Sequence, residues 1–117
     1  DEIQAGNLRL ARESYDKATK LPTEFVGELA KHQSKSQVSW TEARAADDFS
    51  IFRDDLAKMI DMCRQKADYL GYEDLRYDAL LDLYESGLTV ARVDPLFAGL
   101  RENVAPLVKA VVERGER

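Results

Sequence analysis

The side chains that could carry chemistry in this 117-residue chain are few and scattered. His32 is the only histidine and Cys63 the only cysteine. A zinc site of the H-E-x-x-H type needs two histidines on one helix, so this chain cannot supply that motif. We interpret His32 as a surface or partly buried polar residue. Cys63 lies on an apolar stripe that offers no base, so we interpret it as a small buried hydrophobe rather than a nucleophile.

Two pairs of neighbouring acids are the next candidates, Asp47 with Asp48 and Asp54 with Asp55. Adjacent residues on a helix point to different faces, so neither pair is placed to converge for general acid–base catalysis. Helix caps and charges in a first helical turn explain both pairs. We therefore predict structural roles for these four carboxylates.

The densest cluster of polar and aromatic residues is in the segment 77–88, which is Y-D-A-L-L-D-L-Y-E-S-G-L. Its members are Tyr77, Asp78, Asp82, Tyr84 and Glu85. Two interpretations remain open at this point. The tyrosines are either buried with partners for their hydroxyl groups, or the cluster lines the wall of a groove in an enzyme.

Trp40 and Arg44 are one helical turn apart and form a second candidate pair. A cation–π contact between them, or an ion pair from Arg44 to Asp47 or Asp48, is favoured over ligand binding. The sequence has no phosphate-binding glycine loop, no Ser-His-Asp set and no stripe of basic and aromatic residues. We predict no catalytic, cofactor-binding or metal-ligating residue in this chain.

The net charge of -5 disfavours a broad surface for nucleic acid, and acids and bases are interspersed. No apolar run approaches the roughly 20 residues of a membrane span, and no signal peptide opens the sequence. One cysteine excludes an internal disulfide and fits a reducing compartment. We therefore expect no nucleic-acid or membrane partner and a cytoplasmic location.

The elements that position these residues are predicted to be helices. Apolar residues at helical spacing predict helices over about 3–20, 23–47 and 50–70. Pro22 suits the first turn of the second helix, and Ser50 is a candidate cap for the third. The stripe of the third helix is formed by Phe52, Leu56, Met59, Ile60, Cys63, Ala67 and Leu70, and Gly71 ends it.

The polar stretch 31–39 allows either a loop or the middle of a long helix. A stripe remains in helical phase across it, and no glycine or proline lies between Gly27 and Gly71, so one long helix is preferred. The stripe consists of Phe25, Leu29, Ser36, Trp40 and Ala43.

Two further helices are predicted after Gly71. The first is capped by Asp74, closed by Gly87 and buried through Leu75, Leu80, Leu81 and Tyr84. Thr89 or Asp94 caps the last helix, with Pro95 in the first turn of its main part. Pro106 should kink that helix rather than end it, because the apolar stripe continues in phase.

This pattern predicts an all-α fold, an antiparallel bundle of about five helices that includes one long helix. A chain of 117 residues is too short for two cores, so a single domain over residues 1–117 is expected.

Four blocks in order resemble the carboxypeptidase Taq family of zinc metallocarboxypeptidases. They are K-A-T-K-L-P-T-E-F-V-G-E-L-A at 17–30, W-T-E-A-R-A-A-D-D-F-S-I-F at 40–52, Y-D-A-L-L-D-L-Y-E-S-G-L-T-V at 77–90 and D-P-L-F-A-G-L-R-E-N-V-A-P-L-V at 94–108. Family members usually have asparagine where Ala46 or Asp47 falls, and proline near Arg53 and at Ser86. These are cap and turn positions, so the resemblance implies that the fold survives.

The resemblance implies a fragment from the N-terminal region of a larger, mostly helical metallopeptidase, which fits the start without methionine. The family's H-E-x-x-H helix and third zinc-ligating glutamate lie C-terminal to this region. The parent would hold zinc and remove residues from peptide C-termini, whereas this chain alone would bind no zinc and be inactive. It would shape the wall or lid of the substrate groove.

The partners implied are the remainder of the parent and its peptide substrate. Self-association through exposed apolar helix faces is also expected. The alternative is a free-standing acidic helical module for protein interaction, with no enzymatic activity.

Overall fold

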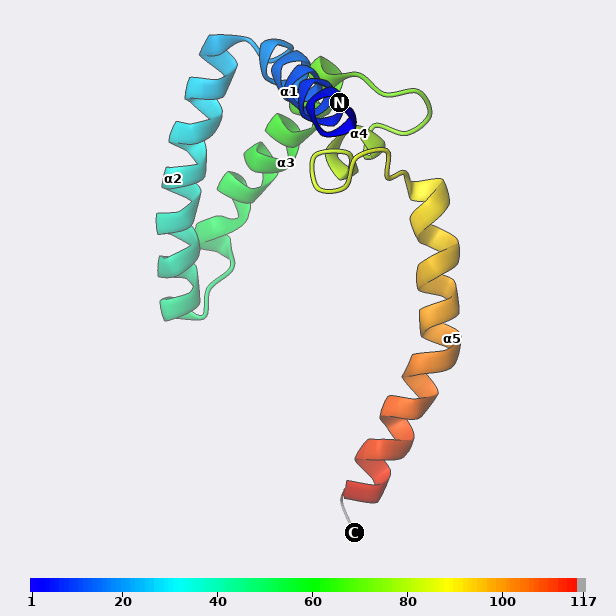
Figure 1. Ribbon diagram of the computed structural model, residues 1–117. Coiled ribbons are helices and arrows are strands. Elements are labelled where there is room, and N and C mark those ends of the chain that lie inside the picture. The colour runs from blue at the N-terminus through cyan, green and yellow to red at the C-terminus, as the bar shows by residue number, and fades with distance from the viewer. Residues whose placement is uncertain (116–117) are drawn as a thin grey trace. The chain divides into compact units, whose positions relative to one another are not determined.

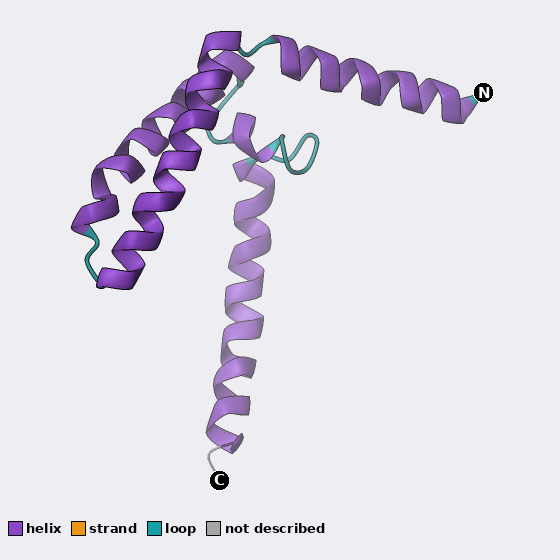
Figure 2. Cartoon of the chain, turned by 90° about the vertical axis from the view of Figure 1, so that its left-hand side faces the viewer, coloured by secondary structure: helices purple, strands orange, loops and turns teal. Residues whose placement is uncertain are grey.

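The computed structural model describes residues 1–115 as five helices joined by turns (Figure 1). They are α1 (Glu2–Thr19), α2 (Thr23–Ala46), α3 (Ser50–Leu70), α4 (Asp78–Leu81) and α5 (Val90–Gly115). Figure 2 shows only helix and loop along this range, which confirms the predicted all-α class. The chain divides into two compact units, residues 1–76 and residues 77–117. A single domain over residues 1–117 stays a prediction.

In the first unit, α1 matches its predicted range and has no buried residue. The Asp1 carboxylate caps it by accepting a hydrogen bond from the Ile3 N–H at 2.8 Å. After α1, Lys20 donates from Nζ to the backbone carbonyl oxygen of Leu70 at 2.7 Å. That carbonyl is at the end of α3 and has no partner within its own helix, so Lys20 ties the start of the α2–α3 hairpin to its end.

The predicted long helix is confirmed, because α2 continues without a break through the polar stretch 31–39. Its buried residues are Phe25, His32, Ser36 and Ala43. Their spacing of seven, four and seven keeps them on one face. Pro22 differs from its prediction, since it lies at the N-cap position and not in the first turn. Its extended ψ of 139° and missing N–H suit it to precede a helix.

The turn between α2 and α3 is made by Asp47 and Asp48. Asp47 adopts a left-handed conformation, with φ 52° and ψ 36°, and ends α2. The Asp48 carboxylate accepts a hydrogen bond from the Ser50 N–H at 2.8 Å. Ser50 is therefore capped by Asp48 and is not itself the cap, so that prediction was wrong. Hydrogen bonds from the Ser50 side chain and backbone hold the pKa of the Asp48 carboxyl below its ordinary value.

The helices α2 and α3 pack against each other as an antiparallel pair (Figures 1 and 2). Ala67 of α3 is completely buried, and its small side chain allows the backbones to approach closely. The predicted stripe of α3 was wrong at two positions. Met62 is buried although it was left out, and Ile60 is 45% exposed although it was included. The other six predicted positions are buried or half-buried, so the predicted face is largely correct and extends further to the side on which Met62 lies.

In the second unit, α4 is much shorter than predicted. It spans four residues, with Ala79 buried and Leu80 and Leu81 half-buried. Asp74 does not cap it. The predicted burial of two other residues was also wrong, because Leu75 is 51% and Tyr84 90% exposed. After Leu81 the chain forms turns, since side-chain carboxylates take up backbone N–H groups there and compete with helical hydrogen bonding.

α5 begins at Val90, earlier than the predicted main helix. The Thr89 carbonyl oxygen accepts hydrogen bonds from the N–H groups of Arg92 and Val93 at 3.0 and 3.1 Å. Pro95 therefore lies in the second turn instead of the first. The helix also continues through Pro106, as predicted. A missing proline N–H removes one hydrogen bond at each site and leaves the helix continuous.

Candidate functional site

Two acids of the segment 77–88, Asp78 and Asp82, have structural roles. The Asp78 carboxylate accepts a hydrogen bond from the Val90 N–H at 2.7 Å, at the first residue of α5. Asp82 accepts one from the Gly87 N–H, also at 2.7 Å. Gly87 has a φ of 76°, a conformation that favours glycine. The two carboxylates thus fix both the loop and the start of α5.

The tyrosines of the same segment point away from any interior of their unit. Tyr77 is 60% exposed and Tyr84 is 90% exposed. The interpretation of buried tyrosines with hydroxyl partners was therefore wrong. Glu85 is also exposed, and its N–H closes a turn onto the Leu81 carbonyl oxygen at 3.1 Å. The loop therefore presents an exposed aromatic ring on a backbone anchored by Asp82.

A second candidate surface lies where α2 turns into α3. A hollow of about 410 Å³ is lined there by Trp40, Ala43, Arg44, Asp47, Asp48, Phe49 and Phe52. Trp40 is 44% exposed, and the rings of Phe49 and Phe52 meet edge to face at 6.5 Å. Within residues 1–115, Arg44 forms neither the ion pair nor the cation–π contact that the spacing favoured. Arg44 lines the hollow instead.

His32 is buried, with only 5% of its surface exposed, so its interpretation as a surface or partly buried residue was wrong. Its Nε2 lies 3.0 Å from the backbone carbonyl oxygen of Asp55 on α3 and 3.3 Å from Ser36 Oγ. The sequence contained a signal for the burial of His32. His32 follows Phe25 by seven residues and precedes Ser36 by four, and both of those were placed on the buried stripe.

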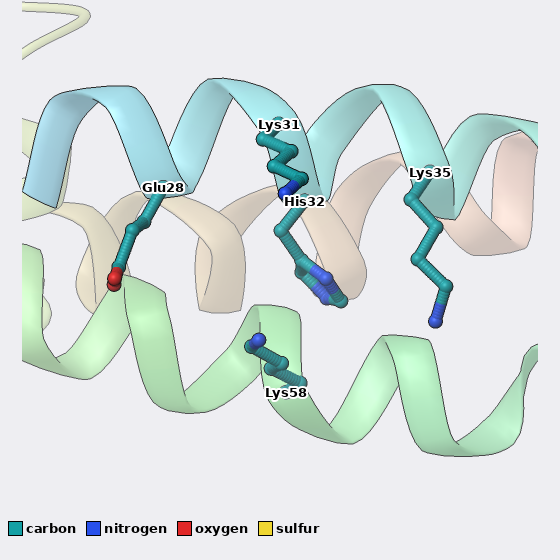
Figure 3. Close-up of a pocket in the computed structure, with 5 residues that line it drawn as sticks. All are labelled: Glu28, Lys31, His32, Lys35 and Lys58. Carbon is teal, nitrogen blue, oxygen red and sulfur yellow. The ribbon is translucent and has the colours of Figure 1, made fainter.

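A hollow of about 380 Å³ opens beside His32 between α2 and α3 (Figure 3). Its lining consists of Glu28, Lys31, His32, Lys35 and Lys58. Lys35 Nζ donates to the Asp55 carboxylate at 2.7 Å. Hydrogen bonds from Lys35 and then Ser39 hold the pKa of the Asp55 carboxyl below its ordinary value, against the opposing effect of partial burial. Asp55 is thus an ionised anchor between the two helices.

The residues present do not fit a catalytic metal ion. Among residues 1–115, no three side chains of the His, Cys, Asp and Glu types are grouped closely enough to hold one. His32 Nε2 is engaged with a carbonyl oxygen, and the half-buried Cys63 carries a free thiol. None of the described helices is both long and apolar enough to cross a bilayer.

The fold and the candidate surfaces define a helical segment whose polar groups mainly cap and join helices. A family model for the carboxypeptidase Taq (M32) metallopeptidases matches residues 1–117. The chain belongs to this family, which confirms the resemblance found in the sequence.

Two proteins show how far this likeness extends. Thermostable carboxypeptidase 1 of Pyrococcus furiosus is 40% identical over 116 residues, which cover 99% of this chain and 23% of that protein. Carboxypeptidase 1 of Bacillus subtilis is 39% identical over 110 residues, which cover 94% of this chain and 22% of that protein.

Solved structures agree with the sequence match. That of Pyrococcus furiosus carboxypeptidase superposes with a TM-score of 0.93 at 40% identity, over 98% of this chain and 23% of that one. Metallocarboxypeptidase 1 of Trypanosoma cruzi gives a TM-score of 0.90 at 30% identity, over 99% of this chain and 24% of that one. The chain therefore spans less than a quarter of the length of these relatives.

Proposed function

We propose that this chain is one helical segment of a cytoplasmic M32 carboxypeptidase that removes residues from peptide C-termini. The observation that carries the proposal is the match to Pyrococcus furiosus carboxypeptidase, which covers 98% of this chain and 23% of that one. In the proposed parent, residues outside this chain hold the zinc ion. Zinc would polarise the scissile carbonyl and activate water, and no residue described here takes part in that step.

The segment is proposed to shape the wall or lid of the substrate groove. Trp40, Arg44 and Tyr84 support this role, because all three side chains are exposed. Aromatic rings and guanidinium groups in such positions suit contact with peptides. The acids beside them are already engaged as caps, so they contribute rigidity and not catalysis.

The remainder of the parent is the proposed partner of α5. The helix carries an apolar stripe, of which Leu96 is 61%, Leu107 63% and Val111 62% exposed. Such a stripe on a long helix is typical of a face that packs against other helices. When the remainder is missing, we expect the stripe to cause self-association. Leu107→Glu should then shift the isolated chain toward monomer in sedimentation measurements, whereas Lys109→Gln should not.

The free-standing interaction module is not favoured, because sequence and fold both match a peptidase over nearly the whole chain. The discriminating experiment is to read the complete open reading frame and express the full protein. We expect an H-E-x-x-H motif downstream, stoichiometric zinc and release of C-terminal residues from peptides. The chain of residues 1–117 alone should show neither zinc nor turnover. Turnover by that chain alone would overturn the proposal.

The groove role has its own test in the complete protein. Trp40→Ala and Tyr84→Ala should raise KM for long peptides by roughly three- to tenfold, the scale of one lost aromatic contact. Tyr15→Ala is the matched control, since Tyr15 is 64% exposed on α1 and lies outside both surfaces. Equal effects of all three substitutions would contradict a specific contact with substrate.

A further inference from the structure

The hollow between α2 and α3 is a local concentration of positive charge in an acidic chain. It brings three lysines and one glutamate together, whereas the whole chain has a net charge of -5. In Figure 3, Glu28 and Lys35 lie at opposite ends of the hollow, with Lys31, His32 and Lys58 between them. The centre of the hollow is therefore its most positive part.

Two of the lysines are available to a ligand. Lys35 is paired with Asp55 at 2.7 Å, whereas Lys31 and Lys58 form no ion pair among residues 1–115. Lys31 comes from α2 and Lys58 from α3, so their side chains approach the hollow from its two walls (Figure 3). Two ammonium groups on facing helices suit an oxyanion whose oxygens can accept from both.

His32 adds a feature that surface lysines lack. A backbone carbonyl oxygen can only accept, so Nε2 must carry the hydrogen in the contact to Asp55 at 3.0 Å. In the neutral ring, Nδ1 then has a lone pair and accepts. The hydrogen bonds of His32 are both made by Nε2, and no buried side-chain polar atom of residues 1–115 lacks a partner. Nδ1, which makes no hydrogen bond within residues 1–115, therefore keeps some solvent exposure, on a side chain that lines the hollow and is only 5% exposed.

We propose that this hollow binds inorganic hydrogen phosphate. The phosphate oxygens accept hydrogen bonds from the ammonium groups of Lys31 and Lys58. The single O–H of the dianion donates to His32 Nδ1. A volume of about 380 Å³ admits the ion. This site does not depend on the proposed peptidase function, because every group in it belongs to the α2–α3 hairpin.

Sulfate is the discriminating probe, because it matches the charge and shape of hydrogen phosphate but has no hydrogen to donate. The complete protein is titrated with phosphate and with sulfate in a calorimeter at about pH 8. A phosphate monoester such as methyl phosphate serves as a third probe, since its second pKa of about 6 leaves it without an O–H. We expect phosphate to bind roughly three- to tenfold more tightly than either of the others.

Substitutions assign the effect to this hollow. His32→Gln keeps an N–H at the position of Nε2 but removes the Nδ1 acceptor, so it should abolish the preference for phosphate over sulfate. Lys31→Gln and Lys58→Gln should each lower the affinity for phosphate and for sulfate by roughly three- to tenfold. Glu28→Gln should raise both affinities, because it removes a negative charge that repels the anions. Lys109→Gln on α5 is the matched control for lost charge and should change neither affinity.

The outcomes decide the proposal. The proposal is supported if the protein prefers phosphate over sulfate and His32→Gln removes that preference, provided that circular dichroism shows the variant to be folded. Equal affinity for phosphate and sulfate would overturn it, since an unselective cationic surface gives that result. Phosphate binding that survives both lysine substitutions unchanged would overturn it as well.

Discussion

The carboxylate of Asp78 reaches the backbone N–H of Val90 at 2.7 Å and so joins α4 to the first residue of α5. The capping group of the last helix therefore comes from twelve residues earlier in the chain. A carboxylate at this end also interacts favourably with the positive end of the helix dipole. The short helix and the long helix are held together by this contact.

Removal of this cap should destabilise the second unit. Asp78→Ala is expected to lower the free energy of unfolding by about 1 kcal/mol, the usual cost of a lost N-cap. Asp78→Asn keeps an oxygen acceptor and should cost less. Urea unfolding followed by circular dichroism measures both. Asp74→Ala is the control, because Asp74 is exposed and caps no helix. A change in the free energy of unfolding above about 0.5 kcal/mol for this control would contradict the assignment of Asp78 as the cap.

Gly71 should resist substitution for conformational reasons alone. Its φ of 81° and ψ of 151° are rarely adopted by other residues, yet an added Cβ would meet no atom within 4 Å. Gly71→Ala should therefore cost about 1–3 kcal/mol of stability. Gly27→Ala, inside α2 and equally unobstructed, should instead stabilise by up to about 1 kcal/mol. Similar effects of the two changes in thermal unfolding would refute the backbone explanation.

Because of the contact between Lys35 and Asp55, the stability of the folded chain should depend on pH in the acidic range. The pKa of Asp55 is lowered in the folded chain, chiefly by the hydrogen bond from Lys35. The contribution of Asp55 to folding stability is therefore fully present above its pKa in the unfolded chain, about 3.9. It is lost as the pH falls through the lower pKa that Asp55 has in the folded chain. Lys35→Gln should make the acid side of the stability curve shallower. Arg53→Gln is the control, since its 3.3 Å pair with Asp54 is exposed and should leave the curve unchanged.

Ala67 should tolerate no larger side chain. It is completely buried where α3 packs on α2, and Ala67→Leu should cost about 1–3 kcal/mol through overpacking. Ala57→Leu adds the same atoms at an exposed position of α3 and should change stability by less than about 0.5 kcal/mol. Guanidinium unfolding would compare the pair. A neutral Ala67→Leu would show that α2 and α3 do not pack this closely in solution.

Local chemistry in the sequence determined most of the helix boundaries. Pro22 and Gly71 act on their own backbone, so the end of α1, the start of α2 and the end of α3 follow from them. The turn between α2 and α3 has no glycine or proline and is made by Asp47 and Asp48. The order of the four sequence blocks likewise predicted the family, which the match over residues 1–117 confirms.

The length of α4 was decided by tertiary structure, because the local sequence contains signals for both a longer and a shorter helix. Asp74 and Gly87 both predicted a longer α4, but Asp78 and Asp82 hydrogen-bond to backbone N–H groups at Val90 and Gly87. A carboxylate can cap any nearby N–H, and sequence spacing does not say which one folds into reach. The length of α4 therefore depended on contacts that exist only after the loop has closed.

His32 shows the same division between sequence and structure. Its spacing from Phe25 and Ser36 placed it on the buried face, and that much was in the sequence. The carbonyl oxygen that accepts from its Nε2 belongs to Asp55, twenty-three residues later. Only the packing of α2 on α3 brings the two together and places the hydrogen on Nε2, which makes Nδ1 the acceptor nitrogen of the neutral ring. The chemistry of a histidine depends on which nitrogen is engaged, and that is a tertiary property.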